Sequence, residues 1–339
     1  MTSAFQLARA GWRVTLFDPA PGTGATWAAA GMIAPSAEIS PGEEENYRLQ
    51  LGALAAWRDI SRDLYDVTGT QLDLFETGTL LVGFDPSDRR LIGQFEVVAR
   101  NYGAAPRRVF REECEEMFDG VSPGIREGLY LGGDAWVDPD QVVTLLTRAS
   151  EALGVKVVHD QVLTASSQGD RVEVTTAEES WHGDAGILAT GANPLPRGVA
   201  ERVANVVRPV RGMTVRVQGL DRSKRPMLRA YVRGRAFYMV SRPGGYSVLG
   251  ASSEERQDLL VEVGELQRLL RDALDVVPSF ESAAIVETRQ GLRPASKDLA
   301  PFFETIDGRW AWSSGHYRHG VTLAPLAANE ALCFVQSLS

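Results

Sequence analysis

An arginine held by a neighbouring proline is the residue of this chain best placed for binding chemistry. Residues 291–294 read Gly-Leu-Arg-Pro, and Pro294 keeps Arg293 away from helical backbone angles. A guanidinium fixed in this way presents two parallel N–H donors, which match the two oxygens of a carboxylate. On these residues alone, a structural arginine that donates to a backbone carbonyl is an equally good interpretation.

A glycine-rich turn follows this arginine. Residues 314–320 read Ser-Gly-His-Tyr-Arg-His-Gly, and a helix is expected over 321–336. Backbone N–H groups at the positive end of a helix can stabilise an anion or an electron-rich ring. We expect Arg293 and the bend near Gly320 to close on opposite sides of one cavity. The alternative is a plain loop that caps the helix.

Two other segments suit the walls of such a cavity. Tyr238 lies in an expected strand and can give its hydroxyl to the same carboxylate, although a tyrosine of the core explains it equally well. The small residues 28–31, within the stretch 23–32, let the backbone approach a bulky planar group closely. Tight helix packing explains these small residues equally well.

Three positions at strand ends suit a dinucleotide. Asp18 ends an expected strand, Val162 lies at a strand edge, and Gly191 turns the chain after a buried strand. Acidic residues at such ends accept hydrogen bonds from ribose hydroxyls, and glycine turns let phosphates approach. Taken singly, Asp18 fits an ordinary helix–strand pair and Gly191 an ordinary buried strand with a turn.

Composition excludes several classes of function. The 339 residues are enough for two domains, and a net charge of −9 argues against nucleic acid or an anionic membrane surface as the main partner. Two cysteines make neither a disulfide framework nor a metal cluster, and the four histidines lack metal-ligand spacing, so we expect no metal. Without a signal layout or an apolar run of about 18 residues, we expect no membrane span and a cytoplasmic protein.

These residues are positioned by elements that alternate at both ends of the chain and read as antiparallel strands in the middle. Helices are expected over 3–10, 46–68, 87–119, 139–153, 263–275 and 321–336. Strands are expected over 12–17, a hairpin over 72–84, and strands over 155–158, 162–165, 172–176, 186–191, 207–217, 226–232, 236–241, 246–250 and 283–289.

This order of elements predicts an α/β fold with an α+β second domain. We expect a discontinuous Rossmann-like domain, over residues 1–45, 137–205 and 290–339. An antiparallel-sheet domain, over 46–136 and 206–289, is expected to interrupt it and to bind the substrate.

The order and spacing of all these segments together resemble the D-amino-acid-oxidase family of FAD-dependent enzymes, and within it the glycine oxidases of thiamine biosynthesis. The likeness runs from Phe5 to about Leu332. It is strongest at residues 28–32 with Glu38, at 237–238, at 250–251, at 291–294 and at 315–325.

The resemblance implies a chemistry and assigns roles to residues. Arg293 and Tyr238 would bind the carboxylate of a small amino acid (glycine, sarcosine or a small D-amino acid), and Arg318 would lie near its amine. Hydride transfer to non-covalent FAD would then be followed by reduction of dioxygen to hydrogen peroxide. The residues implied for FAD are Asp18, Ala25, Thr26, Ala30, Gly31, Met32, Val162, Gly191, His316, Tyr317, Arg318, His319, Gly320, Val321 and Thr322.

One part of the family pattern is not found. A Gly-x-Gly-x-x-Gly turn is expected about 20 residues before the acidic Asp18, but Met1 already falls inside the first helix, so the Rossmann-like domain would lack its first strand. Either Met1 is internal to a longer protein that starts about 15–25 residues upstream, or the chain begins here and binds FAD weakly or not at all.

Several alternatives therefore stay open. One is a quinone-linked D-amino acid dehydrogenase. Another is a truncated, non-catalytic paralogue that binds amino acids. Assembly into a homo-oligomer is also open.

Overall fold

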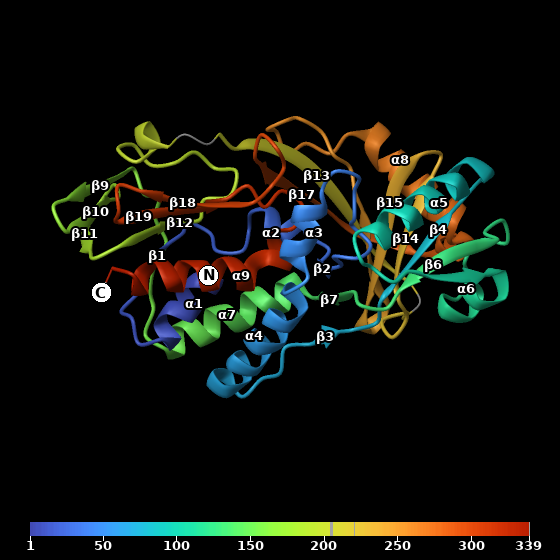
Figure 1. Ribbon diagram of the computed structural model, residues 1–339, viewed down its shortest axis with the longest axis horizontal. Coiled ribbons are helices and arrows are strands. Elements are labelled where there is room, and N and C mark those ends of the chain that lie inside the picture. The colour runs from blue at the N-terminus through green and yellow to red at the C-terminus, as the bar shows by residue number, and fades with distance from the viewer. Residues whose placement is uncertain (204–205, 220, 339) are drawn as a thin grey trace.

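The computed structural model describes residues 1–203, 206–219 and 221–338. Figure 1 shows a group of helices beside several small sheets at one end of the molecule and one large sheet at the other. Residues 204–205, 220 and 339 of the expected domain ranges lie outside the described residues. None of the described helices combines the length and the hydropathy that a bilayer-spanning segment requires.

Four helices form the layer under the small sheets. They are α1 (Thr2–Arg9), α4 (Ala53–Thr68), α7 (Pro139–Ala152) and α9 (Gly320–Gln336), and they contact one another (Figure 1). Their apolar faces share one core, in which Phe5 and Trp57 are almost fully buried. The N-terminus of α7 is capped as predicted, because the Asp138 carboxylate accepts from the N–H of Asp140 at 3.1 Å.

The small sheets contain the parallel strands expected of an α/β domain. Strand β1 (Thr15–Phe17) pairs in parallel with β8 (Lys156–Val158), and β12 (Gly186–Leu188) pairs in parallel with β19 (Trp310–Ser314). Strand β18 (Phe302–Ile306) extends the second pair, and β9 (Thr164–Gln168), β10 (Arg171–Thr175) and β11 (Ser180–Gly183) form an antiparallel sheet. Within the described residues the two parallel pairs belong to separate sheets.

The large sheet has eight strands and carries most of the candidate site. Its order is β17 (Ala284–Ala295), β13 (Arg208–Gln218), β16 (Tyr246–Gly250), β15 (Arg235–Arg242), β14 (Met227–Val232), β4 (Thr79–Gly83), β6 (Glu127–Leu131) and β5 (Arg107–Phe110). The pairing is antiparallel except between β14 and β4, so the expected antiparallel sheet is in fact mixed.

Both faces of this sheet are covered. Helices α6 (Arg111–Met117) and α8 (Val263–Val276) contribute to the core on one face, and α5 (Pro86–Asn101) to a second core. That second core includes the sheet of β2 (Met32–Ile33), β7 (Ala135–Val137) and β3 (Leu74–Phe75). The remaining short elements are α2 (Ala25–Ala28), α3 (Glu44–Gln50) and the 3-10 turns η1 (Ala200–Arg202), η2 (Pro243–Gly245) and η3 (Pro278–Ser282).

Three expected elements were wrong in detail. The helix over 46–68 is two helices, α3 and α4, separated at Gly52. The hairpin over 72–84 does not form, since β3 pairs with β7 while β4 pairs with β14 and β6. Gly78 explains the divergence, because its N–H donates to Asp134 and its carbonyl accepts from Met227, both far away in sequence. The stretch 87–119 contains strand β5 between two helices.

Candidate active site

Arg293 lies inside a strand, because β17 continues past the expected residue 289 to Ala295. It pairs with Val210 of β13, and Pro294 faces Pro209, so the two residues that lack a backbone N–H share one position of the ladder. The guanidinium lies against Gly212, where an added Cβ would be 2.1 Å from Nη2. Glycine at this position therefore makes room for the arginine.

Arg293 forms no ion pair with a carboxylate of the described residues, although the more distant charge of Glu38 acts on it. Its Nη1 donates to the Ser252 carbonyl at 3.0 Å, and no ion pair reaches it from the part of the chain that the structure describes. The side chain is part-buried, and desolvation lowers the pKa of its guanidinium. Since a guanidinium has five N–H donors, most of them remain for an anionic ligand.

Tyr238 belongs to the same cluster as Arg293. It pairs with Gly250 of β16, and its ring lies across that glycine, where an added Cβ would be 2.0 Å from the ring carbon Cζ. Burial raises the pKa of the Tyr238 phenol, and the charge of Arg293 opposes this effect. The hydroxyl therefore stays protonated near neutral pH and can donate to a carboxylate.

The glycine-rich turn packs against the end of the strand that carries Arg293. The Tyr317 N–H donates to the Pro294 carbonyl at 2.9 Å, and His316 forms a β-bridge with Ala295. The two segments therefore lie side by side, and the cavity expected between them stays a prediction. Burial lowers the pKa of His316 to about 4, so this imidazole is neutral at pH 7.

Helix α9 starts directly after this turn. Its first residues carry no side-chain cap, which leaves the N–H groups near Gly320 available. Arg318 is exposed, and its guanidinium lies 5.3 Å from the centre of the Tyr317 ring. The positive end of α9 and the cation of Arg318 are therefore both next to the Arg293 cluster.

A largely buried ion pair lies beside this cluster, and the sequence analysis named its acid, Glu38, but not its arginine, Arg229. Arg229 Nη1 donates to Glu38 Oε1 at 3.2 Å, and His319 Nδ1 lies 3.0 Å from Glu38 Oε2. Burial alone would raise the pKa of Glu38, but the contact with His319 and the positive charges of Arg229 and Arg318 bring it well below its usual range. A signal for Arg229 exists: the two-residue turn 233–234 fixes a register that places it opposite Tyr238.

The small-residue segment 25–32 lies between the large sheet and α9. The Ala28 carbonyl accepts from Thr214 Oγ1, and the Met32 carbonyl accepts from Thr322 Oγ1, both at 3.0 Å. At Gly31 an added Cβ would be 1.9 Å from the Val137 carbonyl oxygen, so this close approach requires glycine. The segment and the start of α9 are thus brought together, as expected.

The immediate neighbours of this segment extend these contacts. Arg242 Nη2 donates to the Ala30 carbonyl at 2.9 Å, and Trp57 Nε1 donates to the Val321 carbonyl at 3.1 Å. Helix α2, which contains Ala25 and Thr26, packs on β17, where Gly291 lets Ala25 approach closely.

Asp18, Val162 and Gly191 lie near the ends of parallel strands. Asp18 follows β1 and its carboxylate accepts from the Ala20 N–H at 3.0 Å, while Val162 follows β8. Gly191 follows β12, and its carbonyl accepts from Ser314 Oγ at 3.2 Å. Ligands of open parallel sheets bind beyond such strand ends, although these three residues share no contact with the Arg293 cluster among the described residues.

Two cavities lie outside this cluster. One, of about 450 Å³, is lined by residues of α4 and of the stretch 71–75. The other, of about 350 Å³, is lined by Trp136, Arg216, Arg242 and their neighbours. Neither is lined by Arg293 or Tyr238, which keep part of their own surface exposed.

Comparison with known proteins assigns a family to this arrangement. A family model described as FAD dependent oxidoreductase matches residues 1–332. The glycine oxidase of Geobacillus kaustophilus is 27% identical over 95% of this chain and 86% of its own length. A protein of Rhizobium etli named putative thiamine biosynthesis oxidoreductase ThiO is 29% identical over 97% of this chain and 91% of its own.

The fold agrees with a solved structure. The crystal structure of glycine oxidase from Geobacillus kaustophilus superimposes with a TM-score of 0.89 and 24% sequence identity, and covers 99% of this chain and 91% of that one.

Proposed function

Because the chain belongs to the family of FAD-dependent oxidoreductases, we propose that it oxidises a small amino acid with dioxygen as the electron acceptor. The substrate class is glycine, sarcosine or a small D-amino acid, in line with the names of the relatives. The observation that carries the proposal is the part-buried Arg293, whose charge has no carboxylate partner in the described chain and lies beside Tyr238. An anionic ligand would supply the missing counter-charge.

The residues around segment 25–32 fit a flat, electron-rich cofactor. The start of α9 offers uncapped N–H groups, His316 is neutral, and the small residues allow close approach. Asp18 directly follows β1, and its carboxylate accepts from the Ala20 N–H; an acidic residue at such a strand end suits a ribose hydroxyl. The residues proposed to hold FAD are Asp18, Ala25, Thr26, Ala30, Gly31, Met32, Val162, Gly191, His316, Tyr317, Arg318, His319, Gly320, Val321 and Thr322.

Bound FAD would supply the two-electron oxidation of the amine, with dioxygen as the final acceptor and hydrogen peroxide as the reduced product. The protein contributes binding and orientation. Arg293 pairs with the carboxylate through two parallel N–H donors, and the neutral Tyr238 hydroxyl donates a third hydrogen bond. Fixing the acid group in this way fixes the direction of the Cα–H bond, and such positioning accounts for much of the rate.

The amine is proposed to enter as the free base. Arg318 and Arg293 are both cations, and Glu38 is already paired with Arg229, so a protonated amine would meet net repulsion.

The proposal also includes a division into two domains. The FAD domain comprises residues 1–45, 137–205 and 290–339, and the substrate domain comprises residues 46–136 and 206–289.

An absorbance experiment tests this function. The purified protein, supplied with FAD, is titrated without oxygen with glycine, sarcosine and D-alanine, and the oxidised-flavin band is followed. Bleaching by one of the three, then recovery of the band with release of one peroxide per amine when oxygen is admitted, is the expected result. A band that none of the three bleaches would refute the function, and recovery only with a quinone would identify a dehydrogenase instead.

A further inference from the structure

A strap of residues 251–262 runs from the end of β16 along β13 and touches the candidate active site. The Ser252 N–H donates to the Met213 carbonyl at 3.2 Å. Arg211 and Glu254 exchange two backbone hydrogen bonds, of 2.8 and 3.0 Å. The strap therefore continues the antiparallel ladder beyond the last residue of β16, Gly250.

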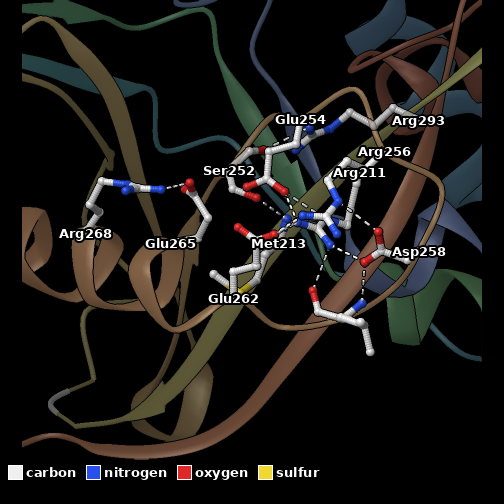
Figure 2. Close-up of polar contacts among 11 residues, drawn as sticks. Arg211, Met213, Ser252, Glu254, Arg256, Asp258, Glu262, Glu265, Arg268 and Arg293 are labelled. Carbon is white, nitrogen blue, oxygen red and sulfur yellow. Dashed lines mark hydrogen bonds and ion pairs between the residues drawn. The ribbon is translucent and has the colours of Figure 1, made fainter.

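The side chain of Arg211 holds the strap along most of its length. Its Nε donates to Glu254 Oε2 at 2.8 Å, and its Nη1 donates to Asp258 Oδ1 at 2.5 Å and to the Leu260 carbonyl at 2.9 Å. Its Nη2 pairs with Glu254 and lies 3.5 Å from Glu262 Oε1 (Figure 2). One guanidinium thus joins four residues of the strap to β13.

Charge, and not apolar burial, is what anchors this strap. Leu259 is 54% exposed and Leu260 is 68% exposed, so neither provides a hydrophobic anchor. The Arg211 side chain, in contrast, is only 2% exposed, because the strap covers it. Removing its charge would leave Glu254 without a cation among the described residues, and would leave Asp258 and Glu262 paired only with the more exposed Arg256.

The acidic cluster of the strap does not need a metal ion to hold it. Oxygens of Glu254, Glu262 and Glu265 lie within 4.8 Å of one another, an arrangement that a cation can bridge. Arginines already supply the positive charge. Arg211 pairs with Glu254 and lies near Glu262, Arg256 pairs with Glu262, and Arg268 pairs with Glu265 (Figure 2). The cluster is therefore an ion-pair network centred on Arg211.

Two groups of the strap contact the candidate active site. The Ser252 carbonyl accepts from Arg293 Nη1 at 3.0 Å, and Ser253 Oγ lies 3.3 Å from the Tyr317 hydroxyl. Figure 2 shows the Arg293 guanidinium beside the Arg211 network, at Ser252. The Ser252 carbonyl fixes one edge of the guanidinium, so its position decides which N–H groups of Arg293 face the ligand.

We propose that Arg211 is a positioning residue for carboxylate binding, which acts through the strap on Arg293. The proposal rests on the proposed function, because it takes Arg293 as the group that binds the substrate's acid. Arg211 itself touches no substrate. It holds Ser252 in place, and Ser252 orients Arg293.

The test replaces Arg211 by methionine, which keeps the length of the aliphatic stem and removes the charge. Arg208→Met is the matched control, since Arg208 lies on the same strand and pairs with Glu255 of the same strap, but at an exposed position. Three quantities are measured for each variant: KM and kcat for the amino acid, the dissociation constant of acetate by calorimetry, and amide hydrogen exchange over residues 251–262.

For Arg211→Met, KM and the acetate dissociation constant are expected to rise by about tenfold or more, while kcat changes by less than about threefold. Amides of the strap should exchange faster. For Arg208→Met, all three quantities should stay within about twofold of the wild type, because exposed ion pairs contribute little. Arg211→Lys should restore part of the acetate affinity.

A variant that does not fold and a result without effect each have a defined consequence. If Arg211→Met does not fold, Glu254→Gln and Asp258→Asn each remove one contact of the clamp and are measured in its place. Unchanged acetate affinity with unchanged exchange in the strap would overturn the inference while leaving the proposed function intact. If the wild type oxidises no amino acid, the proposed function fails, and the clamp is judged on acetate binding and exchange alone.

Discussion

Replacing Arg293 by methionine separates a ligand-binding arginine from a structural one. In the free protein its guanidinium spends one N–H on the Ser252 carbonyl and has no carboxylate partner in the described chain. A bound carboxylate would accept two charge-assisted hydrogen bonds from the remaining donors. At this part-exposed site, losing both is expected to cost about 3 kcal/mol in kcat/KM, or roughly 150-fold.

The stability of the same variant is expected to move the other way or not at all. Desolvation already lowers the pKa of the Arg293 guanidinium, so its charge is unfavourable unless an anion is bound. Methionine removes this unpaired cation and keeps the stem, so Tm should be equal to or above that of the wild type. Activity that falls while stability holds is the signature of a group reserved for a ligand.

The assay measures steady-state oxidation of glycine, acetate inhibition and thermal unfolding in parallel. Arg222→Met serves as the control, because this arginine is more deeply buried than Arg293 and donates to the Asp119 carbonyl and to Ser279 Oγ, both at 3.0 Å. It should lower Tm and leave KM within about twofold. If Arg293→Met keeps the KM and acetate inhibition of the wild type, or loses stability as the control does, the reasoning is refuted.

Three further predictions concern the surroundings of this arginine. Gly212→Ala places a methyl group on the guanidinium of Arg293 and should raise KM about tenfold, whereas Gly219→Ala, whose nearest contact is an ordinary 3.4 Å, should not. Glu38→Gln should lower Tm above pH 5 and lose this effect in more acid solution. Folding depresses the pKa of Glu38, so its stabilisation is present above its ordinary pKa of 4.5 and is lost as the pH falls. An effect on Tm that does not depend on pH would contradict this prediction. Burial raises the pKa of Asp134 to about 7, so the folded protein favours the protonated acid and loses stability as the pH rises towards 7. Asp134→Asn should therefore raise Tm at pH 8 more than at pH 5. An equal change at both pH values would refute this assignment.

Local sequence patterns predicted the parts of the site that depend on neighbouring residues. The restriction that Pro294 places on Arg293, and the glycine turn that opens α9, are properties of a few consecutive residues. The cap at Asp138 is predictable for the same reason. Each of these features is decided by backbone geometry within one or two turns of chain.

Parts that depend on distant pairing could not be predicted in the same way. The hairpin expected over 72–84 fails because β4 finds its partners in β14 and β6, and nothing in those thirteen residues indicates them. The Arg229–Glu38 pair joins residues 191 positions apart. A single arginine in a strand carries no signal until the register opposite Tyr238 is worked out.

The distribution of counter-charges on the large sheet explains why this site would select an anion. Arg289 pairs with Asp140 and Glu287, Arg229 pairs with Glu38, and Arg242 Nη1 lies 2.9 Å from Asp138 Oδ1. Each of these arginines sits on the same sheet as Arg293, and each has a carboxylate supplied by the chain.

Arg293 differs from them in having only a neutral carbonyl as its partner in the described chain. Leaving a cation unpaired in a desolvated position is unfavourable, and the fold has carboxylates at hand for the other arginines. The Arg211 network holds several carboxylates within a few residues of Ser252, and none of those in the described residues pairs with Arg293. A ligand that carries its own carboxylate completes the pattern, and a neutral amine on the same ligand avoids the remaining positive charge of Arg318.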